Sequence, residues 1–247
     1  MSRQVALVTG SATGIGRACA VGFARKGYDV VVNYSKSEAE AKETLGLVEK
    51  EGVQGLLVQC DVGADAAVGK MMQQIEAKFD RLDVLVNNAG TTWFIEHKNL
   101  DELTEEKWDR ILQVNLKGPF FCIRAAIPLM LKNGGGAVVS VSSVAGISGE
   151  GSSIAYAASK GAVNTMTKSF ARAFGPEIRV NAVCPGPVDT RWLRAVMSED
   201  QLKQRTSNFP MQRAALPEDI ADAVIYLASS TSLTTGQCLV VDGGRTM

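Results

Sequence analysis

Histidine is almost absent from this chain of 247 residues, which contains only His97. A zinc site built on histidine needs several such side chains, so the sequence predicts no metal site of that kind. A Ser-His-Asp catalytic arrangement is equally limited, because it would have to use His97.

Cysteine is sparse, and no two cysteines form a CxxC pair. The five are Cys19, Cys60, Cys122, Cys184 and Cys238. Their odd number and scattered positions argue against both a disulfide framework and a metal site. We interpret them as reduced, buried thiols of a cytoplasmic protein.

The sequence also lacks an excess of charge and a long apolar run. Its formal net charge is zero, which argues against a nucleic-acid or membrane-surface partner, since either would require a basic face. The apolar run at 5–8 is too short for a signal peptide. We find no stretch apolar enough to span a bilayer, because glycine and serine interrupt the uncharged segment 134–149.

Short apolar runs alternate with longer segments of helical periodicity along the whole chain. The expected strands are 5–8, 30–32, 56–58, 84–86, 138–141, 179–183 and 239–241, and the expected helices are about 14–26, 38–51, 66–79, 105–131, 155–174 and 217–228. This alternation predicts an α/β fold, a doubly wound Rossmann-type parallel sheet of about seven strands with helices on both faces. We expect one domain over 1–247, with a substrate lid inserted at 186–216.

A glycine-rich turn joins the first expected strand to the first expected helix. It contains Gly10, Thr13, Gly14, Ile15 and Gly16. Glycines there let a pyrophosphate approach the backbone, and the helix N-terminus offers free N–H groups to it. The spacing is GxxxGxG rather than the common GxGxxG, so a turn that binds nothing is the alternative.

The end of the second expected strand carries no acidic residue, although a carboxylate there would favour NAD. It runs Asn33, Tyr34, Ser35, Lys36 and Ser37. Ser35, Lys36 and Ser37 are suited to hold the additional phosphate of NADP, with Arg17 as a possible helper. The sequence therefore favours NADP(H) over NAD(H), unless Lys36 is only a solvated loop lysine.

Tyr156 and Lys160 lie four residues apart in an expected helix and so share one of its faces. A nearby ammonium is expected to lower the pKa of a phenol, which lets tyrosine exchange a proton near neutral pH. Ser143 ends the strand at 138–141, where open α/β sheets place their ligands. The alternatives are an ordinary surface pair and a serine that only closes a strand.

Together these motifs resemble the short-chain dehydrogenase/reductase family over essentially the whole chain. The matching segments are Thr9–Gly16, Asp61-Val62, residues 87–90, Asn115, Ser143, Tyr156 with Lys160, residues 185–190 and residues 241–244. Within the family, the chain is most similar to 3-oxoacyl-acyl-carrier-protein reductases. It departs from them at 133–137, which lacks their usual basic residue, and at Thr13, where relatives that use NADP carry a basic residue.

The resemblance implies a role for each matching residue. Tyr156 would be the general acid/base, Lys160 would lower its pKa and bind the nicotinamide ribose, Ser143 would polarise the carbonyl, and Asn115 would hold a water in a proton relay. The remaining cofactor contacts would be Asp61, Val62, Asn88, Ala89, Gly90, Pro185, Gly186, Val188 and Thr190. The resemblance also implies a homotetramer formed through the helices at 105–131 and 155–174.

The substrate is not defined by these motifs. A 3-oxoacyl thioester, with acyl carrier protein as a possible partner, stands beside sugars, polyols and other small ketones. A regulator that binds NADP(H) without turnover, or a lyase or epimerase on the same fold, is also open. Trp93, Phe94, Trp192, Leu193 and Met197 line a pocket in one interpretation and pack the lid in another. Glu150 and His97 are expected to be surface residues.

Overall fold

The computed structural model describes residues 3–247. Met1 and Ser2 lie outside the described residues, and they belong to the N-terminal segment in which we expected no signal peptide. The strands are β1 (Val5–Val8), β2 (Asp29–Tyr34), β3 (Gly55–Gln59), β4 (Val84–Asn87), β5 (Gly136–Val141), β6 (Ile178–Pro185) and β7 (Cys238–Val241). Within the described residues they form one seven-stranded parallel sheet in the order β3-β2-β1-β4-β5-β6-β7, which confirms the predicted fold class.

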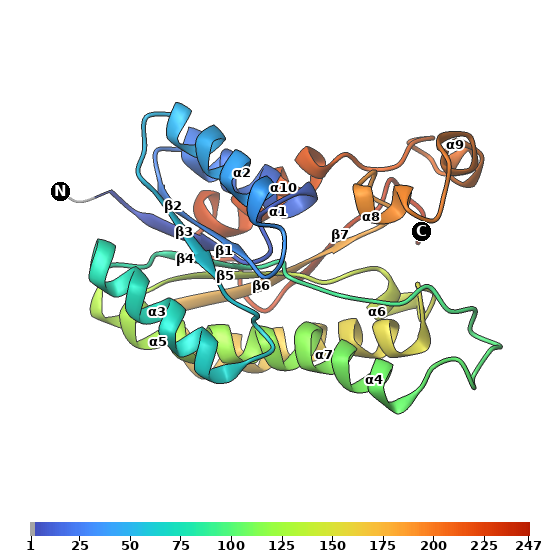
Figure 1. Ribbon diagram of the computed structural model, residues 1–247, viewed down its shortest axis with the longest axis horizontal. Helices are drawn as coiled ribbons and strands as arrows, with labels where there is room; N and C mark the ends of the chain where they lie inside the picture. Colours follow the sequence, from blue (N-terminus) through green and yellow to red (C-terminus); the bar gives the residue numbers. More distant parts are fainter. Residues whose placement is uncertain (1–2) are drawn as a thin grey trace.

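Helices cover both faces of this sheet (Figure 1). The elements are α1 (Gly14–Arg25), α2 (Glu38–Lys50), α3 (Asp65–Phe79), α4 (Glu105–Leu112), the π-helix η1 (Gln113–Lys117), α5 (Gly118–Lys132), α6 (Ala145–Ser148), α7 (Ile154–Phe174), α8 (Arg191–Arg194), α9 (Glu199–Thr206), α10 (Pro217–Ile225) and the π-helix η2 (Tyr226–Ser230). The sequence pattern did not predict α6, α8 or α9. Each has only four to eight residues, too few to establish a helical period.

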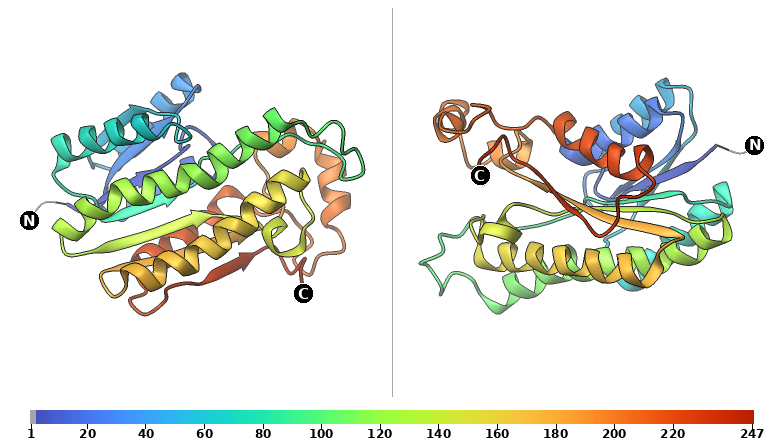
Figure 2. Two further views of the ribbon diagram at one scale, coloured as in Figure 1. Left: turned by 90° about the horizontal axis from the view of Figure 1, so that it is seen from below. Right: turned by 180° about the vertical axis from the view of Figure 1, so that it is seen from behind.

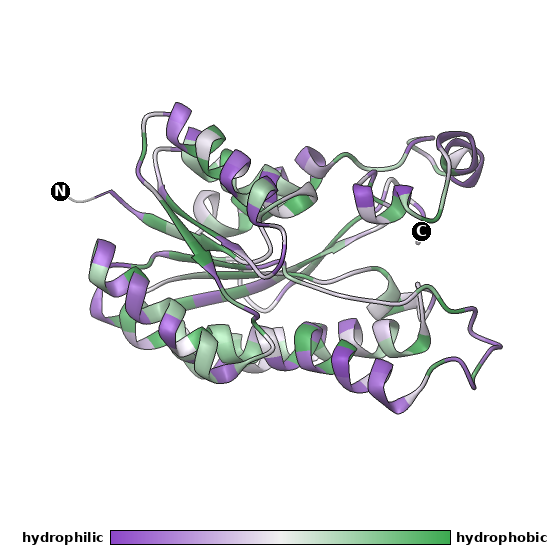
Figure 3. Cartoon of the chain, viewed as in Figure 1, coloured by the Kyte–Doolittle hydropathy of each residue, from purple (hydrophilic) through white to green (hydrophobic). Residues whose placement is uncertain are grey.

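The strands are apolar on both faces because each face is buried under helices. Ala6 and Val8 of β1 belong to one core cluster with α1 and α10, whereas Val5 and Leu7 face a second cluster with α3 and α5. Figure 3 shows this layering as a hydrophobic centre beneath helices whose outer faces are hydrophilic. Figure 2 shows the long helices α5 and α7 on the lower face.

The helical run Glu105–Lys132 corrects one expectation. By length and composition it is apolar enough to cross a membrane, although we expected no such segment. In the structure 56% of its most apolar window is buried, and α5 packs against α3, β4 and β5. The run therefore serves as a core helix of an α/β protein.

Strand order reverses between β1 and β4, and the reversal positions the site. β1 leads through α1 to β2 on one side, whereas β4 leads through α4, η1 and α5 to β5 on the other. The connections leave in opposite directions, so a crevice opens at the carboxyl ends of β1 and β4.

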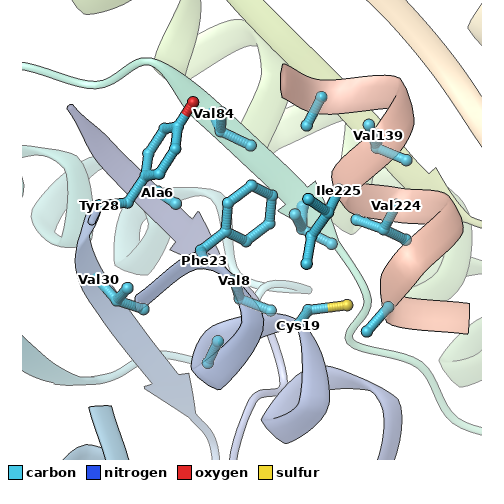
Figure 4. Close-up of a cluster of buried hydrophobic side chains, with 14 of the residues drawn as sticks. Ala6, Val8, Cys19, Phe23, Tyr28, Val30, Val84, Val139, Val224 and Ile225 are labelled. Carbon is cyan, nitrogen blue, oxygen red and sulfur yellow. The ribbon is translucent and has the colours of Figure 1, made fainter. Parts of the chain in front are cut away.

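The first core cluster offers a test of packing. Phe23 is fully buried and meets the ring of Tyr28 edge to face, at 5.4 Å between centroids (Figure 4). We expect Phe23→Ala to lower the free energy of unfolding by about 3–5 kcal/mol, because it removes a ring from a filled core. Denaturant unfolding checks this. Phe94→Ala, at a residue 44% exposed, is the control and should change it by less than about 0.5 kcal/mol; equal effects would contradict the assignment.

Candidate active site

The glycine-rich turn fills the crevice between β1 and β4. Gly10 and Gly14 have φ of 62° and 57°, values that side chains rarely allow. A Cβ added to Gly10 would lie 2.8 Å from the Cα of Ala89, and one added to Gly14 would lie 3.3 Å from Thr190. Thr13 precedes α1 without capping it through its side chain. The first N–H groups of α1 are thus available to an anion.

Two amide side chains hold this turn in place, that of the buried Asn33 and that of the half-buried Asn88. Asn33 accepts a hydrogen bond from the Gly10 N–H at 3.0 Å, and its Nδ2 donates to carbonyls at the end of β3 at 3.1 and 3.2 Å. Asn88 donates to the carbonyls of Thr9 and Gly10 at 2.9 and 3.0 Å. Through these contacts, the ends of β1, β2 and β4 form one rigid unit.

A cavity of about 2020 Å³ runs along the carboxyl edge of the sheet. Typical small-molecule pockets are about 300–1,000 Å³, so this one has room for a dinucleotide and a second molecule. The predicted site residues on its wall are Gly10, Thr13, Gly14, Ile15, Asn33, Ser35, Lys36, Asp61, Val62, Asn88, Ala89, Gly90, Ser143, Tyr156, Pro185, Gly186, Val188 and Thr190.

Four predicted site residues lie behind this wall, within the part of the chain that the structure describes. Gly16 packs beneath the turn, where a Cβ would collide with Gly10 and Asn88. Tyr34 packs in the first core cluster, because β2 is covered on both faces. Asn115 and Lys160 are buried, and both support Tyr156 from behind.

The side chains of Tyr156 and Ser143 come together on the cavity wall. The Ser143 hydroxyl is close enough to the Tyr156 phenol to lower the pKa of that phenol, and the Ser143 Oγ accepts the Ala145 N–H at 3.1 Å. Tyr156 comes from α7, and Ser143 follows β5. Two hydroxyls pointing into one space are suited to bind a single oxygen atom of a ligand.

Lys160 supports the phenol from beneath, but the effect on the pKa differs from expectation. Its Nζ lies 5.6 Å from the centroid of the Tyr156 ring and donates to the Val141 carbonyl at 2.7 Å. Burial raises the pKa of Tyr156 to about 12, partly offset by the hydrogen bond from Ser143. Burial likewise lowers the pKa of Lys160 to about 8. The expected lowering of the Tyr156 pKa is therefore wrong for this structure, because desolvation is the larger effect.

Asn115 lies in η1, where a π-helical turn interrupts the helix. Its Oδ1 accepts the Thr91 N–H at 2.8 Å, and its Nδ2 donates to the Thr91 carbonyl at 2.9 Å and to Ser159 at 3.2 Å. Ser159 in turn donates to the Tyr156 carbonyl. The amide thus braces α7 against the loop after β4, and its role in a proton relay stays a prediction.

Two expectations for individual side chains are corrected by the structure. Arg17 does not extend toward Lys36, because its guanidinium is held by Ala12, Glu40 and Glu43. The Nε2 of His97 is buried with no hydrogen-bond partner in residues 3–247, so His97 is not a solvated loop residue.

Large apolar residues whose role was left open line the cavity. Trp93, Phe94, Trp192, Leu193 and Met197 all contribute to the wall. The ring of Trp192 packs edge to face against the ring of Tyr156, with 6.2 Å between the ring centroids and 88° between the ring planes. Trp192 belongs to α8. Together with α9, this helix lies beyond the end of the sheet to which β6 leads (Figure 1).

Comparison with known proteins agrees with this architecture. A family model described as enoyl-(acyl carrier protein) reductase matches residues 10–246. The solved structure of a Burkholderia xenovorans protein described as a short-chain dehydrogenase/reductase superposes with a TM-score of 0.93 at 38% identity, covering 99% of this chain and 98% of that one. The chain belongs to the short-chain dehydrogenase/reductase family. It is an oxidoreductase of the kind that acts on CH–OH and C=O groups with a nicotinamide cofactor.

Two relatives are similar over nearly their full length. The chain is 42% identical over 245 residues to a Streptomyces violaceoruber protein named as a ketoacyl reductase of granaticin polyketide synthase, covering 97% of this chain and 95% of that protein. It is 38% identical over 244 residues to the 3-oxoacyl-acyl-carrier-protein reductase of Staphylococcus aureus strain N315, with 98% of each chain covered.

The lowered pKa of Lys160 generates a prediction. From pH about 8 to 10.5 the unfolded chain keeps a proton on Lys160 that the folded chain has lost. The free energy of unfolding of the wild type, relative to Lys160→Met, should therefore rise across this interval by up to about 3 kcal/mol. Urea unfolding at several pH values measures it. A relative stability that stays flat or falls would contradict the buried, readily deprotonated ammonium.

Proposed function

We propose that this protein is an NADP(H)-dependent reductase of ketones, with 3-oxoacyl thioesters as its substrate class. The observation that carries the proposal is that Ser143 and Tyr156 lie together on the wall of one cavity. The glycine-rich turn lies on the wall of the same cavity, and Lys160 lies directly behind Tyr156. Two hydroxyls aimed at one oxygen suit a carbonyl better than a carbon–carbon double bond.

Each catalytic residue has a part in the proposed reaction, in which a ketone, a proton and a hydride give a secondary alcohol. NADPH, when bound, supplies the hydride to the carbonyl carbon. Ser143 and Tyr156 donate hydrogen bonds to the carbonyl oxygen, and Tyr156 gives that oxygen its proton. The raised pKa keeps the phenol protonated at neutral pH, as this direction requires. The Lys160 ammonium stabilises the phenolate that remains.

The proposed cofactor site follows the cavity from one end to the other. The pyrophosphate lies on the turn from Gly10 to Gly16, and the adenine lies by Asp61 and Val62. The loop from Asn88 to Gly90 lines the middle, and residues 185–190 receive the nicotinamide. The positive φ values and the tight backbone contacts of Gly10 and Gly14 support this fit.

Ser35 and Lys36 support the choice of NADP(H). Both are exposed and line the cavity at the end of β2, and no acidic residue stands there. Since Arg17 is held by other groups, Lys36 is the main cation in our proposal for the additional phosphate.

The relatives support the thioester and suggest two kinds of partner. One is acyl carrier protein, although 133–137 offers no basic residue for it. The other is a second copy of this chain. Phe120 of α5 is 39% exposed and lies 6.1 Å from Phe170 of α7, an apolar surface that we assign to a homotetramer of cytoplasmic protein. Sugars, polyols and other small ketones are the alternative substrates.

Removal of the phenol tests the reaction. Tyr156→Phe should lower kcat for a short 3-oxoacyl thioester about 10²- to 10⁴-fold, because the proton donor is lost. NADPH oxidation followed by absorbance measures this, and fluorescence titration should show that NADPH still binds. A variant that retains wild-type turnover would contradict the proposed role. Binding of NADPH without turnover by the wild type would contradict the choice of substrate.

Lys36→Ala tests the cofactor. It should lower kcat/KM for NADPH about tenfold and leave that for NADH within about twofold, because only NADPH carries the phosphate that Lys36 faces. Lys26→Ala, at an exposed lysine outside the cavity wall, is the matched control and should change neither. A wild type that prefers NADH would overturn the assignment.

A further inference from the structure

Arg245, near the C-terminus, lines the same cavity as Ser143 and Tyr156. Its side chain is only 18% exposed, and its Nη2 donates to the Oε2 of Glu150 at 2.6 Å. Glu150 is 74% exposed. A largely buried cation on the cavity wall is thus paired with a carboxylate that is mostly exposed to solvent.

The main chain, rather than Glu150, holds Arg245 in place. The Asp242 carboxylate accepts the N–H groups of Gly244 and Thr246 at 2.9 Å, and the Thr246 hydroxyl at 2.7 Å. Gly243 and Gly244 have φ of 69° and 85°, which bends the tail back toward the cavity. The tail packs against the loop that follows α9, where the Met211 N–H donates to the Gly243 carbonyl at 3.1 Å. The backbone at Arg245 is therefore fixed independently of Glu150.

The guanidinium lies at the substrate end of the cavity. Gly151, which follows Glu150, packs against the Tyr156 ring, since a Cβ built there would be 3.3 Å from the ring's Cδ1. Trp192 meets the same ring. The loop that carries Glu150 thus lies directly beside the ring of Tyr156.

Apart from Glu150, the acidic residues of the wall are Asp61 and three residues of α4. Glu105, Glu106 and Asp109 lie on α4, whose Arg110 binds Asp61 at 2.8 Å on the adenine side of the proposed cofactor site. Arg205 of α9 also lines the cavity, and it has no ion pair within residues 3–247.

We propose that Arg245 makes this enzyme selective for keto substrates that carry a carboxylate remote from the reacting carbonyl. The carboxylate displaces Glu150, because an ion pair with an exposed partner is held weakly in water. The fork of the guanidinium then binds the two carboxylate oxygens in parallel. This inference rests on the proposed ketone reduction and specifies its substrate class.

The test compares two substrates that differ in one charge, a 3-oxoacyl thioester ending in a carboxylate and its methyl ester. Wild type should favour the carboxylate in kcat/KM, chiefly through a lower KM. Arg245→Gln should lower kcat/KM for the carboxylate about 10- to 100-fold, and for the ester by no more than about twofold. Arg245→Lys should restore part of the preference. Arg25→Gln is the matched control, since Arg25 pairs with Glu51 outside the wall, and should leave the preference unchanged.

A binding measurement separates this inference from the proposed reaction. A saturated thioester with the same terminal carboxylate but no ketone should quench tryptophan fluorescence, and Arg245→Gln should weaken its binding by a similar factor. If binding shows this dependence while neither ketone is reduced, the proposed reaction is wrong and the role of Arg245 stands. If both ketones are reduced but Arg245→Gln affects them equally, Arg245 only braces the loop and the inference is overturned.

Discussion

The contact between Gly10 and Ala89 is the constraint on which the rest of the site depends. Here the turn after β1 touches the loop after β4, at a distance that leaves no room for a side chain. The reversal of strand order requires these two connections to diverge from neighbouring strands. Their close approach fixes the bottom of the cavity. Hydrogen bonds of the Asn33 and Asn88 side chains with Gly10 hold this contact in place.

Burial sets the chemistry above the bottom of the cavity. The same loss of solvent that raises the pKa of Tyr156 lowers the pKa of Lys160, because each neutral form is favoured where water is excluded. In the reaction that we propose, a protonated phenol next to the Lys160 ammonium suits the transfer of a proton to a ketone oxygen. Ser143 completes the proposed arrangement, since its hydroxyl would donate a second hydrogen bond to that oxygen.

In our proposals, substrate recognition depends on the least regular parts of the chain. The segment from 186 to 216 folds into α8 and α9 and supplies Trp192, while the C-terminal tail supplies Arg245. Neither lies in a regular unit of the sheet. Such loops can change while the turn and the tyrosine helix stay constant, so a common catalytic core serves different ketones.

The sequence by itself determined what rests on short spacing. Alternating apolar and helical segments predicted the parallel sheet, and the residues from Gly10 to Gly16 predicted the turn, because these signals arise within one or two turns of chain. Tyr156 and Lys160 were placed together by helical period alone. The same reasoning missed α8 and α9, which are too short to show a period.

Only the tertiary structure decided what depends on distant segments. The ion pair of Glu150 with Arg245 joins residues 95 positions apart. The guanidinium of Arg17 binds Glu40 and Glu43 of α2, a contact that the residues next to Arg17 in the sequence do not predict. The pKa of Tyr156 likewise follows from how densely other elements cover it. Local periodicity fixes which residues share a helix face, whereas desolvation and long-range pairing exist only once the layers have packed.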